Sequence, residues 1–118
     1  MKIIPSILVQ SEDEFKIQIT AAENVLEMVQ LDIADGKFVP NTTWADPDVV
    51  EKQTDLDIEL HLMVEKPLQE LKRWSATEQI KRVLIHYESV KNLEDIMPTL
   101  HAYGWEIGIV LNPDTPID

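Results

Sequence analysis

The stretch MVQLDIADGKFVPN, residues 28–41, has the pattern of a buried β-strand that ends in a tight Asp-Gly turn and continues as a polar loop. Val29, Leu31 and Ile33 occupy alternate positions, and alternate side chains of a strand point to opposite faces. Asp32 lies on the second face. An ionised carboxylate within a strand is costly unless it is paired, bound to a metal or placed in a wet cavity. The stretch therefore predicts one face packed under helices and another that carries Asp32 into a polar site.

The composition is that of one modest globular domain. The chain has 118 residues, 44% of them hydrophobic, which is enough to bury a core in a single domain over residues 1–118. No segment approaches the ~20 uninterrupted apolar residues that cross a bilayer, and the opening MKIIPS lacks the layout of a signal peptide. Cysteine is absent, which excludes disulfides and thiolate metal sites and favours a cytoplasmic location.

The net charge argues against two classes of partner. The chain carries 22 acidic and 10 basic residues, for a formal charge of -12. A field of that sign opposes binding to nucleic acid or to an anionic membrane, because no basic patch offsets it. We therefore expect neither a nucleic-acid nor a membrane partner. An anionic substrate would need a local site that overrides the field.

Strand and helix patterns alternate along the chain. Ser11 and Glu14 form the S-x-x-E pattern of a capping box, and Asp46-Pro47 has the pattern of an N-cap followed by proline at the first helical position. Phe15, Ile19, Ala22 and Leu26 recur at helical spacing after the first signal. The expected strands span residues 2–8, 27–34, 57–64, 82–87 and 106–111, and the expected helices span 12–24, 47–53, a segment from 67 onward, and 92–102.

The spacing of these elements predicts a parallel sheet. One strand follows another every 25 to 29 residues, a pitch typical of βαβ units. Eight such units would make a (β/α)8 barrel of roughly 200 residues. The chain is therefore expected to be an α/β fold, a partial (β/α)8 TIM barrel with about four βα units and a fifth strand. An open doubly wound sheet is the competing architecture, although its dinucleotide-binding form usually has a glycine-rich turn after the first strand, which is missing.

Five short motifs occur in order, each at the carboxyl end of an expected strand. Together they make the chain resemble the ribulose-phosphate 3-epimerase (pentose-5-phosphate 3-epimerase) family from residue 3 to the end. The resemblance implies a ribulose-phosphate-binding barrel that interconverts ribulose 5-phosphate and xylulose 5-phosphate by metal-assisted proton abstraction at C3. The motifs are PSIL (5–8), LDIADGKFVPN (31–41), ELHLMVEKP (59–67), IHYES (85–89) and GIVLNPDTP (108–116).

The same resemblance implies roles for three residues. Asp32 corresponds to the first of two catalytic aspartates and to a metal ligand. His61 corresponds to a metal ligand that also contacts the substrate, and Ser6 to a substrate contact. The implied substrate is a phosphorylated ketose, and the implied cofactor is a divalent ion such as Zn, Fe, Mn or Co. These side chains would meet at the carboxyl ends of adjacent parallel strands, where barrel active sites form. A metal-bound carboxylate there can serve as a general base.

Two positions depart from the family pattern. Gln30 stands where the family has a histidine ligand, and a neutral amide is a much weaker ligand for a transition metal than imidazole. Ala34 stands where the family usually has methionine, which would leave extra space beside the site. The family's second catalytic aspartate and its phosphate-binding glycine loops belong to strands six to eight, beyond residue 118. We therefore expect residues 1–118 alone to give little or no turnover.

Each candidate residue also has a purely structural interpretation. Asp32 could cap backbone amides of the following turn, and His61 could be a core histidine with its hydrogen bonds satisfied. Asp35 precedes a glycine and is expected to be a turn residue. His86 and Glu88 are expected to line the barrel wall, paired with each other.

Two functions outside catalysis stay open at this point. Gln30 and Ala34 favour a non-catalytic relative that binds sugar phosphate or a protein partner. Self-assembly is the other possibility, because five strands cannot close a barrel and the first and fifth strands would have unpaired edges. Such edges predict a homo-oligomer.

Overall fold

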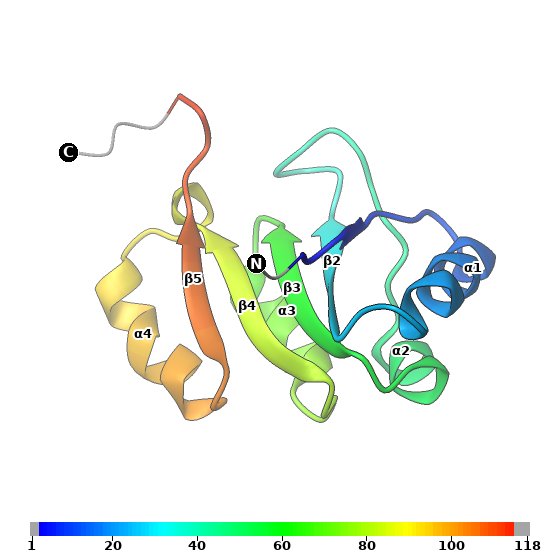
Figure 1. Ribbon diagram of the computed structural model, residues 1–118. Helices are drawn as coiled ribbons and strands as arrows, with labels where there is room; N and C mark the ends of the chain where they lie inside the picture. The colour runs from blue at the N-terminus through cyan, green and yellow to red at the C-terminus, as the bar shows by residue number, and fades with distance from the viewer. Residues whose placement is uncertain (1–2, 115–118) are drawn as a thin grey trace.

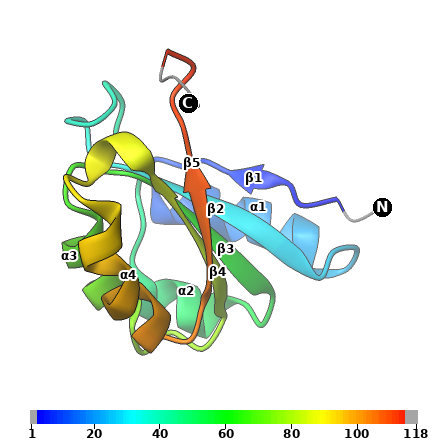
Figure 2. The ribbon, with the colours of Figure 1, turned by 90° about the vertical axis from the view of Figure 1, so that its left-hand side faces the viewer.

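The computed structural model describes residues 3–114 and contains one parallel sheet with the strand order β1-β2-β3-β4-β5. All strands point toward the same end of the sheet (Figure 1), and Figure 2 shows α3 and α4 on one side of it. The strands are β1 (Ser6–Ile7), β2 (Met28–Ala34), β3 (Asp57–Met63), β4 (Ile80–His86) and β5 (Glu106–Val110). The helices are α1 (Glu12–Glu23), α2 (Pro47–Gln53), α3 (Pro67–Trp74), α4 (Leu93–Ala102) and the 3-10 turn η1 (Tyr87–Ser89).

The order of the strands distinguishes between the two expected architectures. Each described strand pairs in parallel with the next strand along the chain, without the reversal of order that defines a doubly wound sheet. Sequential parallel neighbours joined by helices are the arrangement of a (β/α)8 barrel. The prediction of a partial barrel is therefore confirmed, and the open doubly wound alternative is wrong.

The helices begin where the sequence predicts. Ser11 caps α1, since its Oγ accepts a hydrogen bond from the Glu14 N–H at 3.1 Å, and the Glu14 carboxylate accepts one from the Gln10 N–H at 3.0 Å. Asp46 caps α2 by accepting the Asp48 N–H at 3.0 Å, and proline follows it at the first helical position. Such caps satisfy backbone donors that would otherwise lack a partner.

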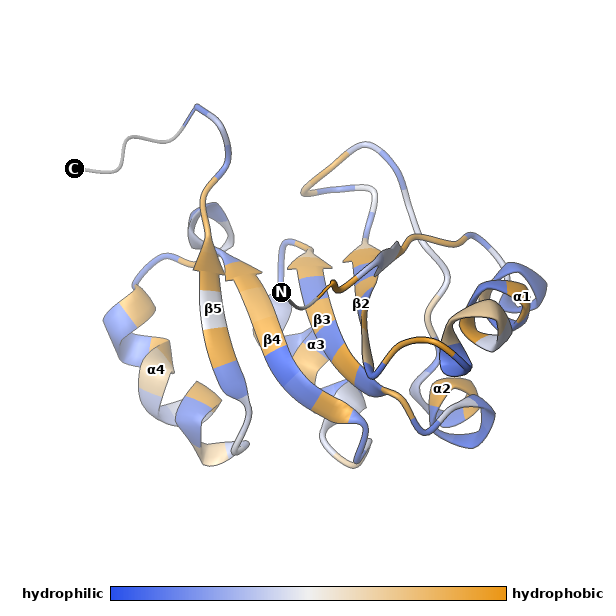
Figure 3. Ribbon diagram, viewed as in Figure 1, coloured by the Kyte–Doolittle hydropathy of each residue, from blue (hydrophilic) through white to orange (hydrophobic). Residues whose placement is uncertain are grey.

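The core lies between the sheet and the helices. Alternate residues of the strands pack there, and β3 shows the resulting stripes of hydrophobic and hydrophilic residues (Figure 3). Trp74 of α3 is fully buried, and its Nε1–H donates to Glu70 at 2.8 Å. The most deeply buried large side chains are Trp74, Phe15, Ile19, Leu31, Ile58, Leu60, Leu62, Leu71, Ile85, Leu100, Val9 and Val29.

The first and fourth strands differ from their expected bounds. The first was expected at residues 2–8, of which residue 2 lies outside the described residues, but the ladder covers only Ser6–Ile7. Pro5 has no N–H to donate, which shortens pairing at this edge. The fourth strand begins at Ile80 rather than Arg82, because the β3–β4 register shifts between Ile58 and Glu59 and brings Ile80 beside Ile58.

The sheet has open edges at β1 and β5. Unpaired edges of this kind favour association with another chain. The homo-oligomer expected from the sequence stays a prediction, and so does the organisation of residues 1–118 as a single domain. Within residues 3–114, every helix is too short or too polar to cross a bilayer.

Candidate functional site

Asp32 and His61 meet on the face of the sheet opposite to the helices. They are directly paired in the β2–β3 register, while their chain neighbours Leu31 and Ile33 point into the core. The Asp32 Oδ1 and His61 Nδ1 atoms are 3.2 Å apart, and only 12% of the Asp32 side chain and 18% of the His61 side chain are exposed. Two of the three residues predicted for the site are therefore neighbours in a largely buried setting.

Gln30 joins these two side chains. Its Nε2 donates to Asp32 Oδ1 at 2.7 Å and lies 3.3 Å from His61 Nδ1. The amide therefore contacts both groups at the position where the family resemblance places a histidine. Rotating the amide by half a turn would bring its oxygen against the carboxylate, so the donor orientation is the favourable one.

Ser6 lies outside this cluster. It is exposed and pairs in register with Gln30, two residues before the Asp32 position along the neighbouring strand. Two residues of a strand span about 6.6 Å. Among the described hydrogen bonds of the site, none involves Ser6, so its role as a substrate contact stays a prediction.

His86 is a member of the cluster that the sequence alone did not identify. It ends β4, and its Nε2 lies 2.8 Å from the Nε2 of His61, with the two rings stacked at a centroid distance of 5.0 Å. The ring of Phe38, from the loop after β2, packs on it at 5.2 Å. Alternation along β4 puts His86 on the same face as Arg82, which could have indicated a position facing the site.

Glu88 continues the line of polar groups beyond His86. Its Oε1 lies 3.8 Å from His86 Nδ1, as the expected pairing requires, and its carboxylate accepts the Asn112 N–H at 3.1 and 3.2 Å. Burial lowers the pKa of His86, and the neighbouring His61 lowers it further, while the Asn112 side chain and the Glu88 carboxylate oppose both effects. The pKa of His86 therefore lies below that of an ordinary histidine.

Asp35 fastens the loop that follows β2. Its Oδ1 accepts the N–H groups of Lys37 and Phe38 at 2.8 and 2.9 Å, and its Oδ2 accepts the Glu65 N–H at 2.8 Å. Burial acts to raise the pKa of Asp35, but these backbone donors outweigh it and lower the pKa. Asp35 is the expected turn residue, beside Gly36 at φ 77°, and it also ties two loops together at the carboxyl end of the sheet.

Ala34 does not leave open space beside the site. It is only 4% exposed, Met63 lies beside it in the β2–β3 register, and its N–H donates to Thr43 Oγ1 at 2.9 Å. The expectation of extra room at this position is therefore wrong, because a neighbouring strand and the following loop enclose the alanine.

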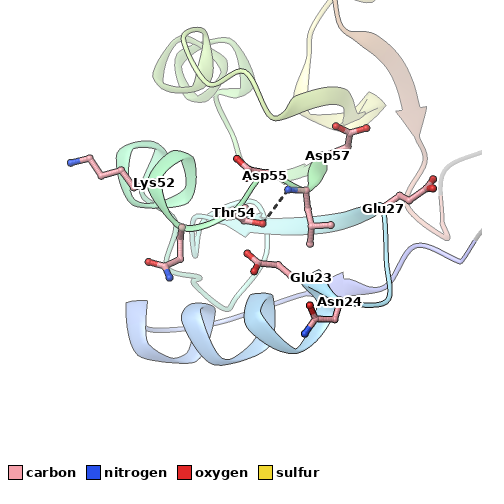
Figure 4. A pocket seen from close by; sticks show the side chains of 9 residues that line it. Glu23, Asn24, Glu27, Lys52, Thr54, Asp55 and Asp57 are labelled. Atoms are coloured by element: carbon pink, nitrogen blue, oxygen red, sulfur yellow. Dashed lines mark hydrogen bonds between the residues drawn. The ribbon is translucent and has the colours of Figure 1, made fainter.

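A separate pocket lies at the opposite end of the sheet, where the strands begin (Figure 4). Its volume is about 670 Å³, and it contains four carboxylates and one lysine but no histidine. The paired histidines His61 and His86 lie at the other end of the sheet. The pocket is lined by Glu23, Asn24, Glu27, Lys52, Gln53, Thr54, Asp55, Leu56 and Asp57.

Comparison with known proteins assigns the family. The sequence matches the family described as "Ribulose-phosphate 3 epimerase family" over residues 2–118. The chain belongs to the ribulose-phosphate 3-epimerase family. It is 31% identical to a ribulose-phosphate 3-epimerase from Bacillus subtilis, over 99% of the chain and 55% of that protein. It is 30% identical to the enzyme of that name from Chlamydia muridarum, over 83% of the chain and 45% of that protein.

The chain spans about half the length of the curated relatives it matches. A third relative, the chloroplastic ribulose-5-phosphate-3-epimerase of Arabidopsis thaliana, is 31% identical over 98% of the chain but only 42% of its own length. The family match covers the segment that carries Asp32 and His61, and the roles of these two residues stay predictions. The activity of the whole relatives is a proposal for this chain.

The side chains present do not fit a tightly held divalent metal. Asp32 and His61 supply one carboxylate and one imidazole, whereas Gln30 directs its N–H groups toward them. Within residues 3–114, no group of three or more His, Cys, Asp or Glu side chains converges as a metal site would require. Catalytic metals in proteins commonly take three protein ligands. At this position the glutamine supplies a hydrogen-bond donor to Asp32 and His61.

Replacing Gln30 with histidine is expected to strengthen Zn²⁺ or Co²⁺ binding by at least ~10-fold, or about 1.4 kcal/mol. The new imidazole would complete a three-ligand set with Asp32 and His61. Calorimetric titration of the purified variants measures the change. Gln18→His, on the exposed side of α1, is the matched control. Equal affinity in the two histidine variants would contradict this interpretation of the site.

Proposed function

We propose that this chain contributes one half of an active site that interconverts ribulose 5-phosphate and xylulose 5-phosphate by moving a proton at C3. The observation that supports this most is the contact between Asp32 and His61 at adjacent parallel strands of a chain that belongs to the epimerase family. A carbon acid next to a carbonyl needs a positioned base, and a carboxylate kept largely from water suits that task.

Asp32 is the proposed base. Its Oδ1 is engaged by the Gln30 amide, which fixes the orientation of the carboxylate and leaves Oδ2 to take the proton. His61 and Ser6 are the proposed substrate contacts. Asp32 and His61 are also the proposed ligands of a weakly held Zn, Fe, Mn or Co ion, whose contribution when bound would be to polarise the substrate carbonyl.

The rest of the catalytic apparatus is proposed to lie outside residues 1–118. The family resemblance places a second acid/base aspartate and a phosphate-binding site on later strands, and barrel phosphate sites generally form after strands seven and eight. We therefore propose that this chain binds the substrate weakly. We also propose that it transfers a proton on only one side of the sugar. A cytoplasmic location stays a prediction.

Nuclear magnetic resonance titration with ribulose 5-phosphate tests the location of the site. We expect amide shifts centred on Asp32, His61 and the loop after Gly36, with a dissociation constant on the order of 1–10 mM. Inorganic phosphate at the same concentrations is the control ligand and should leave these amides unshifted, because the proposed contacts recognise the sugar. Shifts confined to the acidic pocket, or none at any residue, would contradict the proposal.

A further inference from the structure

The loop formed by residues 35–42 stands above the carboxyl ends of β2 and β3 (Figure 1) and is closed at its base. The Thr43 N–H donates to the Ala34 carbonyl at 3.1 Å, and the Ala34 N–H donates to Thr43 Oγ1 at 2.9 Å. One residue further into the loop, Asp35 and Thr42 form an isolated antiparallel bridge. Compact loops whose ends lie together in this way are frequently functional.

This loop brings an aromatic ring to a strand that is not its neighbour. The Phe38 ring packs on the ring of His86 with a centroid distance of 5.2 Å and an interplanar angle of 54°. Because His86 ends β4, the loop after β2 reaches past β3 to make this contact. The His61 ring stacks on His86 at 5.0 Å. Phe38 therefore adds an apolar ring to the pair of histidines.

The burial of His86 indicates that the Phe38 ring acts as a cover. His86 lies on the face of the sheet opposite to the helices, yet only 9% of its side chain is exposed. On that face, loops and neighbouring side chains must keep the ring from water. Phe38 is itself half-buried and supplies apolar surface at this place. Excluding water strengthens the electrostatic interactions of the polar groups nearby.

Asp35 fixes Phe38 through the backbone. Its Oδ1 accepts the N–H of Phe38 itself at 2.9 Å, together with that of Lys37 at 2.8 Å. Its Oδ2 accepts the Glu65 N–H, from the segment that follows β3, at 2.8 Å. Hydrogen bonds to an ionised carboxylate are stronger than those between neutral groups. Asp35 therefore joins the loop to the end of the strand that the loop must pass to reach His86.

We propose that Asp35 is a positioning residue that holds Phe38 against His86, and that the Phe38 ring is the apolar wall of the site on the side of β4. The wall limits the access of water to His86 and to the polar groups beside it. Both oxygens of Asp35 stay bonded to backbone amides and take no part in proton transfer. The inference rests on the proposed function only for the use of this wall by a sugar, since the loop and its contacts require no substrate.

Nuclear magnetic resonance of the chain labelled at phenylalanine and histidine tests the position of Phe38. The chain has two phenylalanines and three histidines, and Phe15 in the core is the internal reference. We expect a nuclear Overhauser cross-peak between the Phe38 and His86 rings in the wild type, and its loss in Asp35→Ala. Asp13→Ala, an exposed substitution of the same type on α1, should keep the cross-peak. Absence of the cross-peak from the wild type, or unchanged intensity in folded Asp35→Ala, would overturn the proposal.

Asp35→Asn is the milder variant and covers the case in which Asp35→Ala does not fold. Asparagine keeps one oxygen for the N–H groups of Lys37 and Phe38, but its NH2 group cannot accept the Glu65 N–H. The cross-peak between Phe38 and His86 should therefore weaken. Full intensity in this variant would contradict the role given to the bond between Asp35 and Glu65.

A neutral, soluble gadolinium chelate measures how far Phe38 shields His86 from solvent. The chelate should relax the ring protons of exposed His101 on α4 strongly and those of His86 weakly. His86 should lose this protection in Phe38→Ala and in Asp35→Ala but keep it in Phe38→Tyr, which retains the ring. Equal relaxation of His86 in the wild type and Phe38→Ala would overturn the assignment of Phe38 as the wall. Because neither measurement uses a substrate, failure of this inference is distinct from failure of ribulose 5-phosphate binding.

Discussion

Replacing Arg82 with methionine is expected to lower the free energy of unfolding by about 3 kcal/mol. Arg82 of β4 donates to Glu59 of β3 and to Glu106 of β5, each at 2.8 Å. The Glu59 side chain is only 8% exposed, so loss of its partner leaves a carboxylate away from water. Breaking a buried ion pair is strongly destabilising because of the charge that remains. The expected loss is at the lower end of what breaking a buried ion pair costs, because 36% of the Arg82 side chain is exposed.

Glu106→Gln is the matched control for Arg82→Met. The Glu106 side chain is 71% exposed, and exposed ion pairs contribute less than about 1 kcal/mol. The double variant Glu59→Leu with Arg82→Met should recover most of the lost stability, since an apolar pair can replace a buried ion pair. Urea denaturation followed by tryptophan fluorescence measures all three. Equal losses in Arg82→Met and Glu106→Gln would show that Glu59 tolerates an unpaired charge.

The sheet and the helices that cover it could be predicted because they depend on patterns within short stretches of sequence. The alternation in residues 28–41 places Val29, Leu31 and Ile33 in the core, as found. The capping signals at Ser11 and Asp46 mark the starts of α1 and α2, because they satisfy backbone donors that neighbouring residues cannot reach. The strand pitch then implies the parallel sheet.

The site could be predicted only in part, because it depends on register between strands. Asp32 and His61 were found through motifs that match a family, and their contact follows from direct β2–β3 pairing. His86 was missed as a partner of His61, since the β3–β4 register shifts between Ile58 and Glu59 and such shifts have no plain sequence signal. The position of Ser6 likewise depends on a short edge strand.

Gln30 shows how sequence and structure differ in what they reveal. The family resemblance implies a histidine ligand at this position, so the glutamine predicts weaker metal binding. The structure adds that the amide contacts both Asp32 and His61 and so occupies the space between them. A change that looks like a simple loss of a ligand therefore also introduces a new hydrogen-bond donor.

A large effect on hydrogen–deuterium exchange is expected when Asp32 is replaced. In D2O, the chain is expected to exchange the C3 proton of a pentulose 5-phosphate for deuterium without inverting the carbon, because one base reaches only one side of the sugar. General-base catalysis typically contributes 10²–10⁴-fold, so Asp32→Asn should slow this exchange by about 10²-fold or more, to the rate of buffer alone. Asp48→Asn, the same substitution at an exposed position of α2, should leave it unchanged.

Proton NMR of ribulose 5-phosphate and of xylulose 5-phosphate in D2O is the most direct measurement of the role assigned to Asp32. The expected result is loss of the C3 signal of one of the two epimers with the wild type and with Asp48→Asn, and its persistence with Asp32→Asn. Equal exchange rates in the wild type and Asp32→Asn would contradict the assignment of Asp32 as the base.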